Sequence, residues 1–82
     1  MLEALKNKPL KVGIKQVRKA IEKGTACGVY LAKDADDFVT QKVLDLCKQR
    51  NIQVTEVPAM KELGQACGID VGAAVACIVR ND

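Results

Sequence analysis

The stretch CGVYLAKDADDFVTQKVLDLCKQRNIQVTEV, Cys27 to Val57, contains an apolar run, an acidic turn, an amphipathic run and a last segment of mixed apolar and polar residues. Cys27–Ala32 is apolar almost throughout and includes β-branched and aromatic residues, which predicts a buried strand. The acidic turn Asp34–Asp37 is typical of a helix N-cap, and a helix is predicted over Phe38–Arg50. A second strand is predicted at Ile52–Val57. A strand, a helix and another strand in this order predict an α/β fold.

The flanking segments continue the alternation of strands and helices. Helices are predicted at residues 2–7, Ile14–Lys23 and Ala59–Cys67, and a glycine follows each of the last two, as is common at helix ends. Strands are predicted at Lys11–Val12 and Ala73–Val79. The lengths suit crossover units, so we expect helices on both faces of a mixed sheet. The residues expected in the core are Val12, Ile14, Val17, Ile21, Val29, Leu31, Val43, Leu46, Val54, Leu63, Val75, Cys77 and Val79.

The length of 82 residues predicts one domain spanning residues 1–82. The sequence shows no signal-peptide pattern, and no apolar run approaches the ~20 residues of a membrane span. We therefore expect a cytoplasmic protein with no membrane partner. The four cysteines form no C-x-x-C pair and the chain has no histidine, so we expect no metal site. All four are predicted to be small buried residues in a reducing compartment: Cys27, Cys47, Cys67 and Cys77.

The residue types that are missing argue against several classes of function. Without serine or histidine, the chain cannot form the Ser–His or Cys–His pairs of nucleophilic enzymes. Tyr30 and Phe38 are its only aromatic residues, too few for the stacking surfaces that bind single-stranded bases. Neither glycine-rich nucleotide-binding motif is present. We therefore expect no catalysis, no cofactor and no small-molecule substrate.

The net charge of +3 is unevenly distributed along the chain. Residues 1–33 contain eight lysines and arginines but only two acidic residues, a formal charge of +6. Residues 34–82 contain five basic and eight acidic residues, a formal charge of −3. This concentration of positive charge in the first third suggests that a polyanion is bound on one side of the protein.

The predicted helix Ile14–Lys23 has an apolar face and a basic face. At 100° per residue, its apolar residues fall within one arc: Ile14, Val17, Ala20 and Ile21. The other side has lysines four residues apart and a glutamine beside them: Lys15, Lys19, Lys23 and Gln16. Like charges at this spacing destabilise a helix by about 0.2–0.5 kcal/mol per pair. Glu22 is the only acidic residue in the helix to offset them.

The start of this helix is equally unusual. Gly13 brings no side chain to cap the first amides, which have no partner within a helix and carry a partial positive charge. Lys15 in the first turn is unfavourable for the helix dipole. This arrangement suits a phosphate or an electron-rich base edge docked at the helix start. The alternative is a solvated face with an ordinary glycine N-cap, and these residues alone do not decide between the two.

Two further segments are candidates for a functional site. In the predicted loop Ile69–Gly72, the side chains of Ile69 and Val71 either turn into the core or meet a partner. Small residues follow this loop, as if another group approached closely. Asp34–Asp37 follows a strand, where α/β enzymes place magnesium-binding or catalytic groups. Capping of the next helix by Asp36 or Asp37 explains these acids more simply.

Three segments carry a resemblance to a known family: VGIKQVRKA at Val12–Ala20, LAKDAD at Leu31–Asp36 and KELGQACGIDVGAA at Lys61–Ala74. They resemble the ribosomal protein L7Ae family, which binds kink-turn RNA, and especially its small bacterial, YbxF-type members. The resemblance covers nearly the whole chain beyond the first ten residues. The run L-G-x-A-C-G-I-[DE]-V-G-A-A is its most specific part.

The resemblance implies a three-layer α/β/α sandwich around a mixed four-stranded sheet. It also implies binding to a kink-turn, a sharply bent duplex with tandem sheared G·A pairs beside a three-nucleotide bulge. The helix start would then enter the widened major groove, where Lys15 and Gln16 meet guanine edges and Lys19 meets guanines or phosphates. The loop Ile69–Val71 would cover the bulge. The full set of RNA-binding residues expected on this basis is Gly13, Ile14, Lys15, Gln16, Lys19, Lys11, Lys33, Ile69, Asp70, Val71 and Gly72.

One departure bears on specificity. Many archaeal and eukaryotic members have Asn-Glu where this chain has Lys15–Gln16, and the bacterial members share the Lys–Gln pair. The loss of the carboxylate changes which base groups can be read, although glutamine still donates and accepts hydrogen bonds.

We interpret the chain as a monomeric, non-catalytic protein that binds and stabilises kink-turns, in association with the ribosome or a riboswitch. Two alternatives remain open. The first is a protein–protein interaction module of the translation machinery that uses Ile69 and Val71. The second, less favoured, is a magnesium-dependent α/β enzyme that uses Asp34 and Asp36.

Overall fold

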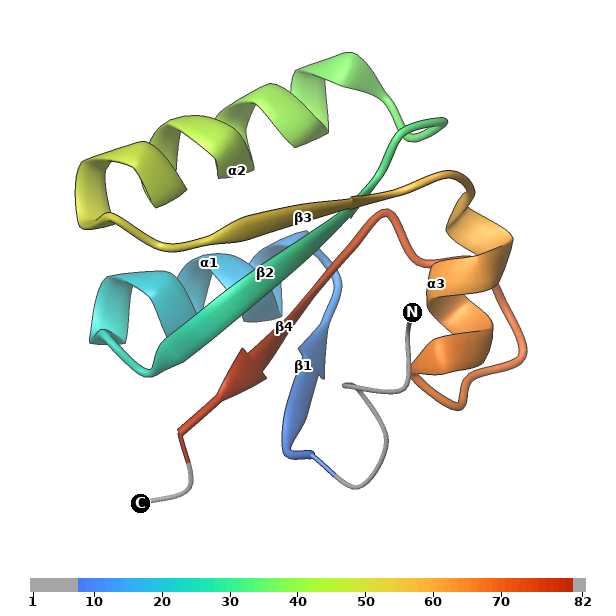
Figure 1. Cartoon of the computed structure of the whole chain (residues 1–82), viewed down its shortest axis with the longest axis horizontal. Coiled ribbons are helices and arrows are strands. Elements are labelled where there is room, and N and C mark those ends of the chain that lie inside the picture. Colours follow the sequence, from blue (N-terminus) through green and yellow to red (C-terminus); the bar gives the residue numbers. More distant parts are fainter. Residues whose placement is uncertain (1–7, 81–82) are drawn as a thin grey trace.

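The computed structural model of the chain describes residues 8–80, so the helix predicted at residues 2–7 lies outside the described residues. Strands and helices alternate along this part of the chain (Figure 1). Within it, no helix is both long enough and apolar enough to cross a membrane. The elements in chain order are β1 (Leu10–Val12), α1 (Ile14–Lys23), β2 (Ala26–Ala32), α2 (Asp37–Arg50), β3 (Val54–Val57), α3 (Met60–Ala66) and β4 (Val75–Val79).

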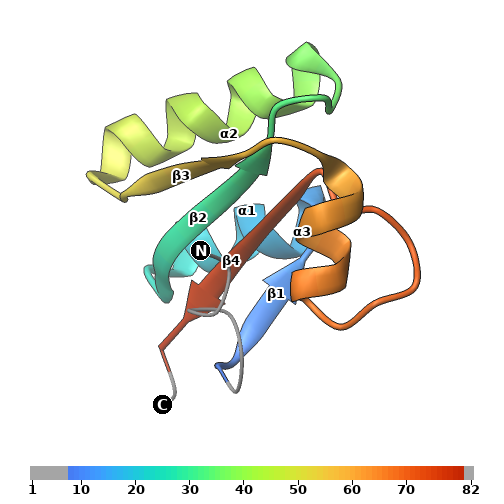
Figure 2. The same ribbon diagram turned by 45° about the vertical axis from the view of Figure 1, so that its right-hand side comes forward.

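The four strands form one mixed sheet in the order β1-β4-β2-β3. The strand β2 runs parallel to β3, with Val29 opposite Val54, and antiparallel to β4, with Leu31 opposite Val75. The strand β1 pairs antiparallel with the other side of β4. The helices α1 and α2 lie together on one face of the sheet and α3 covers the other (Figures 1 and 2). The predicted three-layer α/β/α sandwich with a mixed four-stranded sheet is confirmed.

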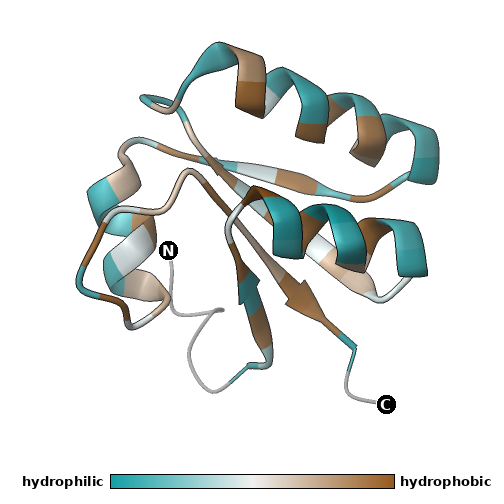
Figure 3. Cartoon of the chain, turned by 180° about the vertical axis from the view of Figure 1, so that it is seen from behind, coloured by the Kyte–Doolittle hydropathy of each residue, from teal (hydrophilic) through white to brown (hydrophobic). Residues whose placement is uncertain are grey.

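The apolar residues form two clusters, one on each face of the sheet. The larger cluster includes the buried residues of α1 and α2, packed on Val29, Leu31, Val75 and Cys77. The smaller cluster lies under α3, around the fully buried Leu63. Viewed from behind, α1 shows a mainly hydrophilic outer face (Figure 3). The amphipathic pattern predicted for this helix is therefore observed, with Val17, Ala20 and Ile21 as its buried residues.

The predicted core is right at its centre and wrong at its margins. Five of the predicted residues are only half-buried: Val12, Ile14, Leu46, Val54 and Val79. Val12 and Val54 belong to the two edge strands, which have a neighbour on one side only. Small residues complete the interior, since they let the helices approach the sheet closely. Ala20, on the predicted apolar arc, and Cys47, among the cysteines predicted to be buried, are indeed buried. The buried residues that were not predicted are Ala32, Ala35, Val57, Ala73 and Ala76.

Several predicted boundaries need correction. The strand predicted from Ile52 begins at Val54, because Ile52 still donates its amide to the Cys47 carbonyl at the end of α2 (2.9 Å). The strand predicted from Ala73 begins at Val75, because the Ala73 amide is bound by the Met60 carbonyl (3.0 Å). β1 and β2 each begin one residue earlier than predicted, as does α2. Ala59 and Cys67, predicted as the first and last residues of α3, are instead its N-cap and C-cap residues.

The cysteines do not all behave as predicted. Cys47 and Cys77 are buried, whereas Cys67 is half-buried and Cys27 is exposed. Cys27 lies where the register between β2 and β4 shifts, so the apolar run around it is not buried throughout. Burial raises the pKa of the Cys77 thiol to about 11 and raises the pKa of Cys47 by the same mechanism. These two thiols are therefore protonated at neutral pH.

Candidate nucleic-acid interface

The first turn of α1 presents uncapped amides. The Gly13 amide donates to the Val75 carbonyl (3.0 Å), which ties the start of the helix to the start of β4. The first hydrogen bond within the helix runs from the Val17 amide to the Gly13 carbonyl (3.0 Å). Within residues 8–80, no side chain caps the amides that lie between them, and the first turn holds no acidic residue. The end of the helix with partial positive charge is therefore left open to an external acceptor.

Gly13 is required here by its backbone conformation. Its φ of 96° and ψ of 155° lie in a region that residues with a side chain rarely adopt. A Cβ atom at this position would meet no atom of the described residues within 4 Å, apart from its chain neighbours. Among the described residues, the space in front of Gly13 is therefore open.

The polar side chains predicted around the helix start are presented to solvent. Lys15, Gln16 and Lys19 are all exposed. Ile14 differs from them, because it is half-buried and packs against the larger apolar cluster. Its contribution to the surface at the helix start is therefore mainly its backbone amide.

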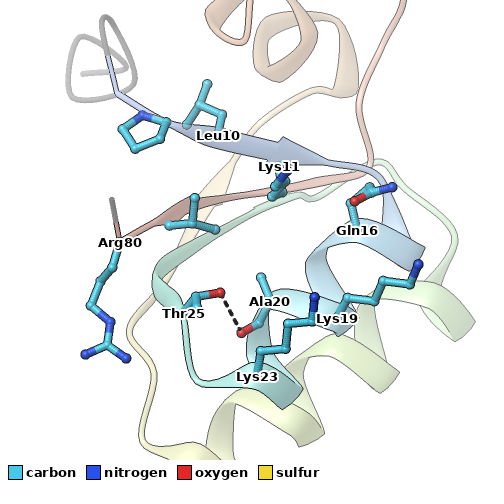
Figure 4. A pocket seen from close by; sticks show the side chains of 10 residues that line it. Leu10, Lys11, Gln16, Lys19, Ala20, Lys23, Thr25 and Arg80 are labelled. Atoms are coloured by element: carbon cyan, nitrogen blue, oxygen red, sulfur yellow. Dashed lines mark hydrogen bonds between the residues drawn. The ribbon is translucent and has the colours of Figure 1, made fainter. Parts of the chain in front are cut away.

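Lys11 lies across from these side chains rather than at the helix start. It is exposed on β1, and it lines a groove between β1 and α1 together with Gln16 and Lys19 (Figure 4). The groove has a volume of about 480 Å³. Lys23 and Arg80 line the same groove. The structure thus brings a residue of β1 and a row of residues from α1 to one continuous basic surface.

Lys33 lies at the same end of the sheet as the helix start. It directly follows β2, and its amide donates to the carbonyl of Val57 at the end of β3 (2.8 Å). The amide of the preceding residue, Ala32, donates to the Ala74 carbonyl (2.9 Å). The Val75 carbonyl accepts a hydrogen bond from the Gly13 amide. The start of α1, the exposed Lys33 and the end of the 69–72 loop therefore lie at the same end of the sheet.

The loop between α3 and β4 presents one apolar side chain. Val71 is 69% exposed, and Asp70 and Gly72 are exposed too. Ile69 is half-buried against the smaller apolar cluster under α3. Of the two apolar residues predicted to meet a partner, Val71 is therefore the more available, and Ile69 mainly anchors the loop.

This loop is held tightly against α3. The Ile69 amide donates to the Gly64 carbonyl (3.0 Å), and the Ala73 amide donates to the Met60 carbonyl (3.0 Å). A Cβ atom at Gly64 would lie 2.0 Å from the Val71 carbonyl oxygen, and one at Gly72 would lie 3.1 Å from the Met60 Cβ. The close approach predicted from the small residues in this region is thus an approach to α3 of the same chain.

The acidic residues after β2 cap helices. A carboxylate oxygen of Asp36 accepts a hydrogen bond from the Phe38 amide (2.8 Å), which confirms the predicted capping of α2. A carboxylate oxygen of Asp34 accepts one from the Met60 amide (2.8 Å) in the first turn of α3. Asp37 is the first residue of α2 rather than part of the loop. Both carboxylates proposed for a magnesium site thus have a structural role.

One basic residue of this surface, Arg80, was not assigned from the sequence, and another, Lys23, was assigned only to the lysine stripe of the helix. Lys23 belongs to the predicted lysine stripe but was not included in the RNA-binding set. Arg80 follows β4, and its guanidinium donates to the carbonyl of Gly24, 56 residues away in the chain. The i, i+4 spacing identified Lys23 as a member of the stripe, whereas no local pattern places Arg80 beside α1.

Comparison with known proteins agrees with this fold. The Ribosomal protein L7Ae/L30e/S12e/Gadd45 family matches residues 1–82. A protein named RNA-binding protein from Geobacillus sp. (strain WCH70) is 46% identical over 69 residues, which is 84% of each chain. RNA-binding protein YbxF from Geobacillus stearothermophilus is 44% identical over the same length and share.

A solved structure, that of the Giardia lamblia 15.5kD RNA binding protein, is also similar to this chain. Its TM-score is 0.83 at 26% sequence identity, and the match covers 99% of this chain and 67% of that one. The match over the full length and the identity to the bacterial proteins confirm the resemblance seen in the sequence. The chain belongs to the Ribosomal protein L7Ae/L30e/S12e/Gadd45 family.

Proposed function

We propose that this protein binds RNA and recognises kink-turns through the start of α1. The observation that carries the proposal is the uncapped first turn, flanked by the exposed side chains of Lys15 and Gln16. A guanine presents the O6 and N7 acceptors in the major groove, and Lys and Gln side chains supply donors to such acceptors. The relatives from both Geobacillus species are named RNA-binding proteins, which supports RNA as the partner.

The loop beside α3 completes the proposed site. The family resemblance implies that this loop covers the bulged nucleotide, which lies next to the G·A pairs of a kink-turn. The exposed side chain of Val71 offers this nucleotide an apolar surface, and the hydrogen bonds from the loop to α3 hold the loop in place. A rigid loop loses little conformational freedom on binding, which favours affinity.

The proposed mechanism is stabilisation of the bent RNA. The protein binds the kinked form better than the extended form and so shifts the population between them. To move an RNA from about 1% kinked to about 99% kinked, it must bind the kinked form roughly 10⁴-fold more tightly. Contacts to base edges contribute about 1–3 kcal/mol each, so two or three of them at the helix start account for this difference.

The test measures the affinity of Lys15→Ala and Gln16→Ala proteins for a kink-turn RNA and for a straight duplex of equal length. Lys48→Ala, on the exposed side of the last turn of α2, serves as the matched control. Each site variant is expected to lose about 1–3 kcal/mol on the kink-turn, roughly 5- to 150-fold in affinity, and much less on the duplex. Equal losses on both RNAs would contradict base recognition and leave a role in phosphate binding only.

The natural RNA is to be identified in cells. Crosslinking of the protein to RNA, followed by sequencing, distinguishes a ribosomal RNA from a riboswitch as the host of the kink-turn. All four cysteines are free thiols, which supports a reducing, cytoplasmic environment for this interaction. Capture of protein partners that withstands ribonuclease treatment would instead support an interaction module of the translation machinery.

A further inference from the structure

A second groove lies between the edge strand β3 and the helix α2, which runs along this strand (Figures 1 and 2). We call it the β3–α2 groove, and its volume is about 480 Å³. Its apolar lining includes Leu44 of α2 and Val54 of β3, both half-buried at the margin of the larger apolar cluster. Lys33 is the one residue that this lining shares with the proposed RNA-binding set.

The outer edge of β3 is unpaired within residues 8–80, because β2 is its one neighbour in the sheet. The carbonyls of Gln53 and Val57 accept hydrogen bonds from the amides of Val29 in β2 and of the residue after β2 (3.0 and 2.8 Å). Backbone groups of alternate residues point to opposite sides of a strand in a parallel pair. Those of Val54 and Glu56 therefore point away from β2, where their amides and carbonyls are available to another strand.

The side chains beside this edge divide the groove into an apolar half and an acidic half. The helix α2 and the strand β3 run in opposite directions, so that the start of α2 lies beside the end of β3 (Figure 1). Asp37 is the first residue of α2 and lines the groove together with the exposed Glu56 near the end of β3. Leu44 lies two turns further along α2, on the side of Val54. A strand added at this edge would thus meet an apolar position and, two residues away, an acidic one.

The charges favour a basic protein segment over the other possible occupants. The lining contains two carboxylates, Asp37 and Glu56, against one ammonium group, Lys33, which leaves a formal charge of −1 and disfavours RNA phosphates. A second copy of the chain, paired antiparallel through the same outward-facing residues, would set its Val54 opposite Glu56. The two Glu56 side chains would then be diagonal neighbours about 7–8 Å apart, a repulsive arrangement.

We propose that the β3–α2 groove binds an extended segment of a partner protein, which adds to the sheet as a strand antiparallel to β3. Main-chain hydrogen bonds to Val54 and Glu56 would hold the segment, and pockets for alternate side chains would select its sequence. Antiparallel pairing is the slightly more stable arrangement. Since the segment then runs opposite to β3, its basic residue facing Glu56 comes first and its aliphatic residue facing Val54 comes two positions later. The inference goes beyond the proposed RNA binding and does not depend on it.

The test titrates the isotope-labelled protein with a capped peptide of seven residues and follows the backbone amides by NMR. The peptide consists of threonines, with arginine at its third position and valine at its fifth. The Val54 and Glu56 amide signals are expected to shift most and their hydrogen exchange to slow. The same peptide with N-methyl groups on the arginine and valine amides is expected to lose this binding, because these amides donate to β3.

A charge reversal tests the predicted sequence preference. Glu56→Lys is expected to weaken binding of the arginine peptide by about 5-fold or more, and to bind a peptide with glutamate in place of arginine more tightly than wild type does. The matched control is Glu62→Lys, the same change at an exposed site on α3, and is expected to leave both affinities unchanged. Both variants change exposed side chains, and their amide spectra verify that the fold is retained.

Equal binding of the N-methylated peptide, or an unchanged preference in Glu56→Lys, would overturn the proposal. Shifts of the Val54 and Glu56 signals that depend on protein concentration, without peptide binding, would assign the edge to a second copy instead. If kink-turn RNA rather than the peptide shifted these signals, the groove would belong to the RNA. Failure of the proposed function is distinguishable, because it is measured as RNA affinity, which Glu56→Lys is expected to leave unchanged, and it leaves the peptide titration unaffected.

Discussion

Replacement of Gly64 by alanine tests whether the close contact between α3 and the 69–72 loop limits stability. Gly64 is fully within α3, where alanine is favoured over glycine by about 1 kcal/mol on helix propensity alone. The structure predicts the opposite outcome. A Cβ atom at Gly64 would lie 2.0 Å from the Val71 carbonyl oxygen and 3.0 Å from the Val71 carbonyl carbon. These are backbone atoms, so no side chain can rotate away to make room.

The magnitude follows from the size of this overlap. To restore an ordinary contact of about 3.4 Å, the loop backbone and α3 must separate by more than 1 Å. Their separation weakens the hydrogen bonds from Ile69 to Gly64 and from Ala73 to Met60. Inserted methyl groups that force such backbone shifts cost about 1–3 kcal/mol, and the severe overlap here places the cost near 3. After the propensity gain is subtracted, we expect a net loss of about 2 kcal/mol, or roughly 8–16 °C in the melting temperature.

The assay is chemical denaturation of wild type, Gly64→Ala and the matched control Gly28→Ala. A Cβ atom at Gly28 meets nothing within 4 Å, so alanine there is expected to change stability little or to raise it slightly by restricting the unfolded chain. The Gly64 variant is also expected to bind kink-turn RNA more weakly, since the loop that presents Val71 has moved. If Gly64→Ala proved as stable as wild type, the loop would not be packed on α3 as described, and this reasoning would be refuted.

Two further predictions concern capping and the buried thiols. Asp34→Ala removes the acceptor for the Met60 amide and is expected to lower the free energy of unfolding by about 1 kcal/mol, measured by urea denaturation. Asp34→Asn keeps an acceptor oxygen and should retain most of this stability. The Cys77 thiol has a pKa of about 11 in the folded state, against about 9 in the unfolded state. Because the unfolded state loses this proton first, the free energy of unfolding is expected to fall as pH rises from 9 to 11. A Cys77→Ala protein measured in parallel should fall less steeply, and equal slopes would exclude this thiol as the cause.

The sequence predicted the elements well where the pattern is local. The helix α1 has the predicted bounds, because its apolar spacing and the glycines on either side mark both ends. The acidic turn capped α2 as expected, through Asp36. Predictions failed where long-range contacts decide the outcome. The hydrogen bond to the Met60 carbonyl keeps Ala73 out of β4, and the register shift between β2 and β4 exposes Cys27. Neither feature has a local signature in the sequence.

The candidate site shows the same division. The exposed polar side chains of α1 follow from helical periodicity, so Lys15, Gln16 and Lys19 could be identified before any coordinates. The loop was harder, because Ile69 and Val71 look alike in the sequence. Their different exposure depends on how the backbone of the loop lies against α3. Arg80 could not be assigned, since its proximity to Gly24 arises only when the end of β4 pairs with the start of β2.

Under the proposed function, the two ends of α1 would play different parts in binding. At the start of the helix, uncapped amides and polar side chains offer directional hydrogen bonds, which distinguish one base edge from another. Toward its end, Lys23 and the anchored Arg80 offer charge, which strengthens binding to any phosphate backbone but carries no base information. If both ends engage one RNA, phosphate contacts at the far end fix the axis of a stem relative to the G·A pairs. A protein that fixes this relative orientation favours the bent RNA over a straight one, in addition to the preference that the base contacts give.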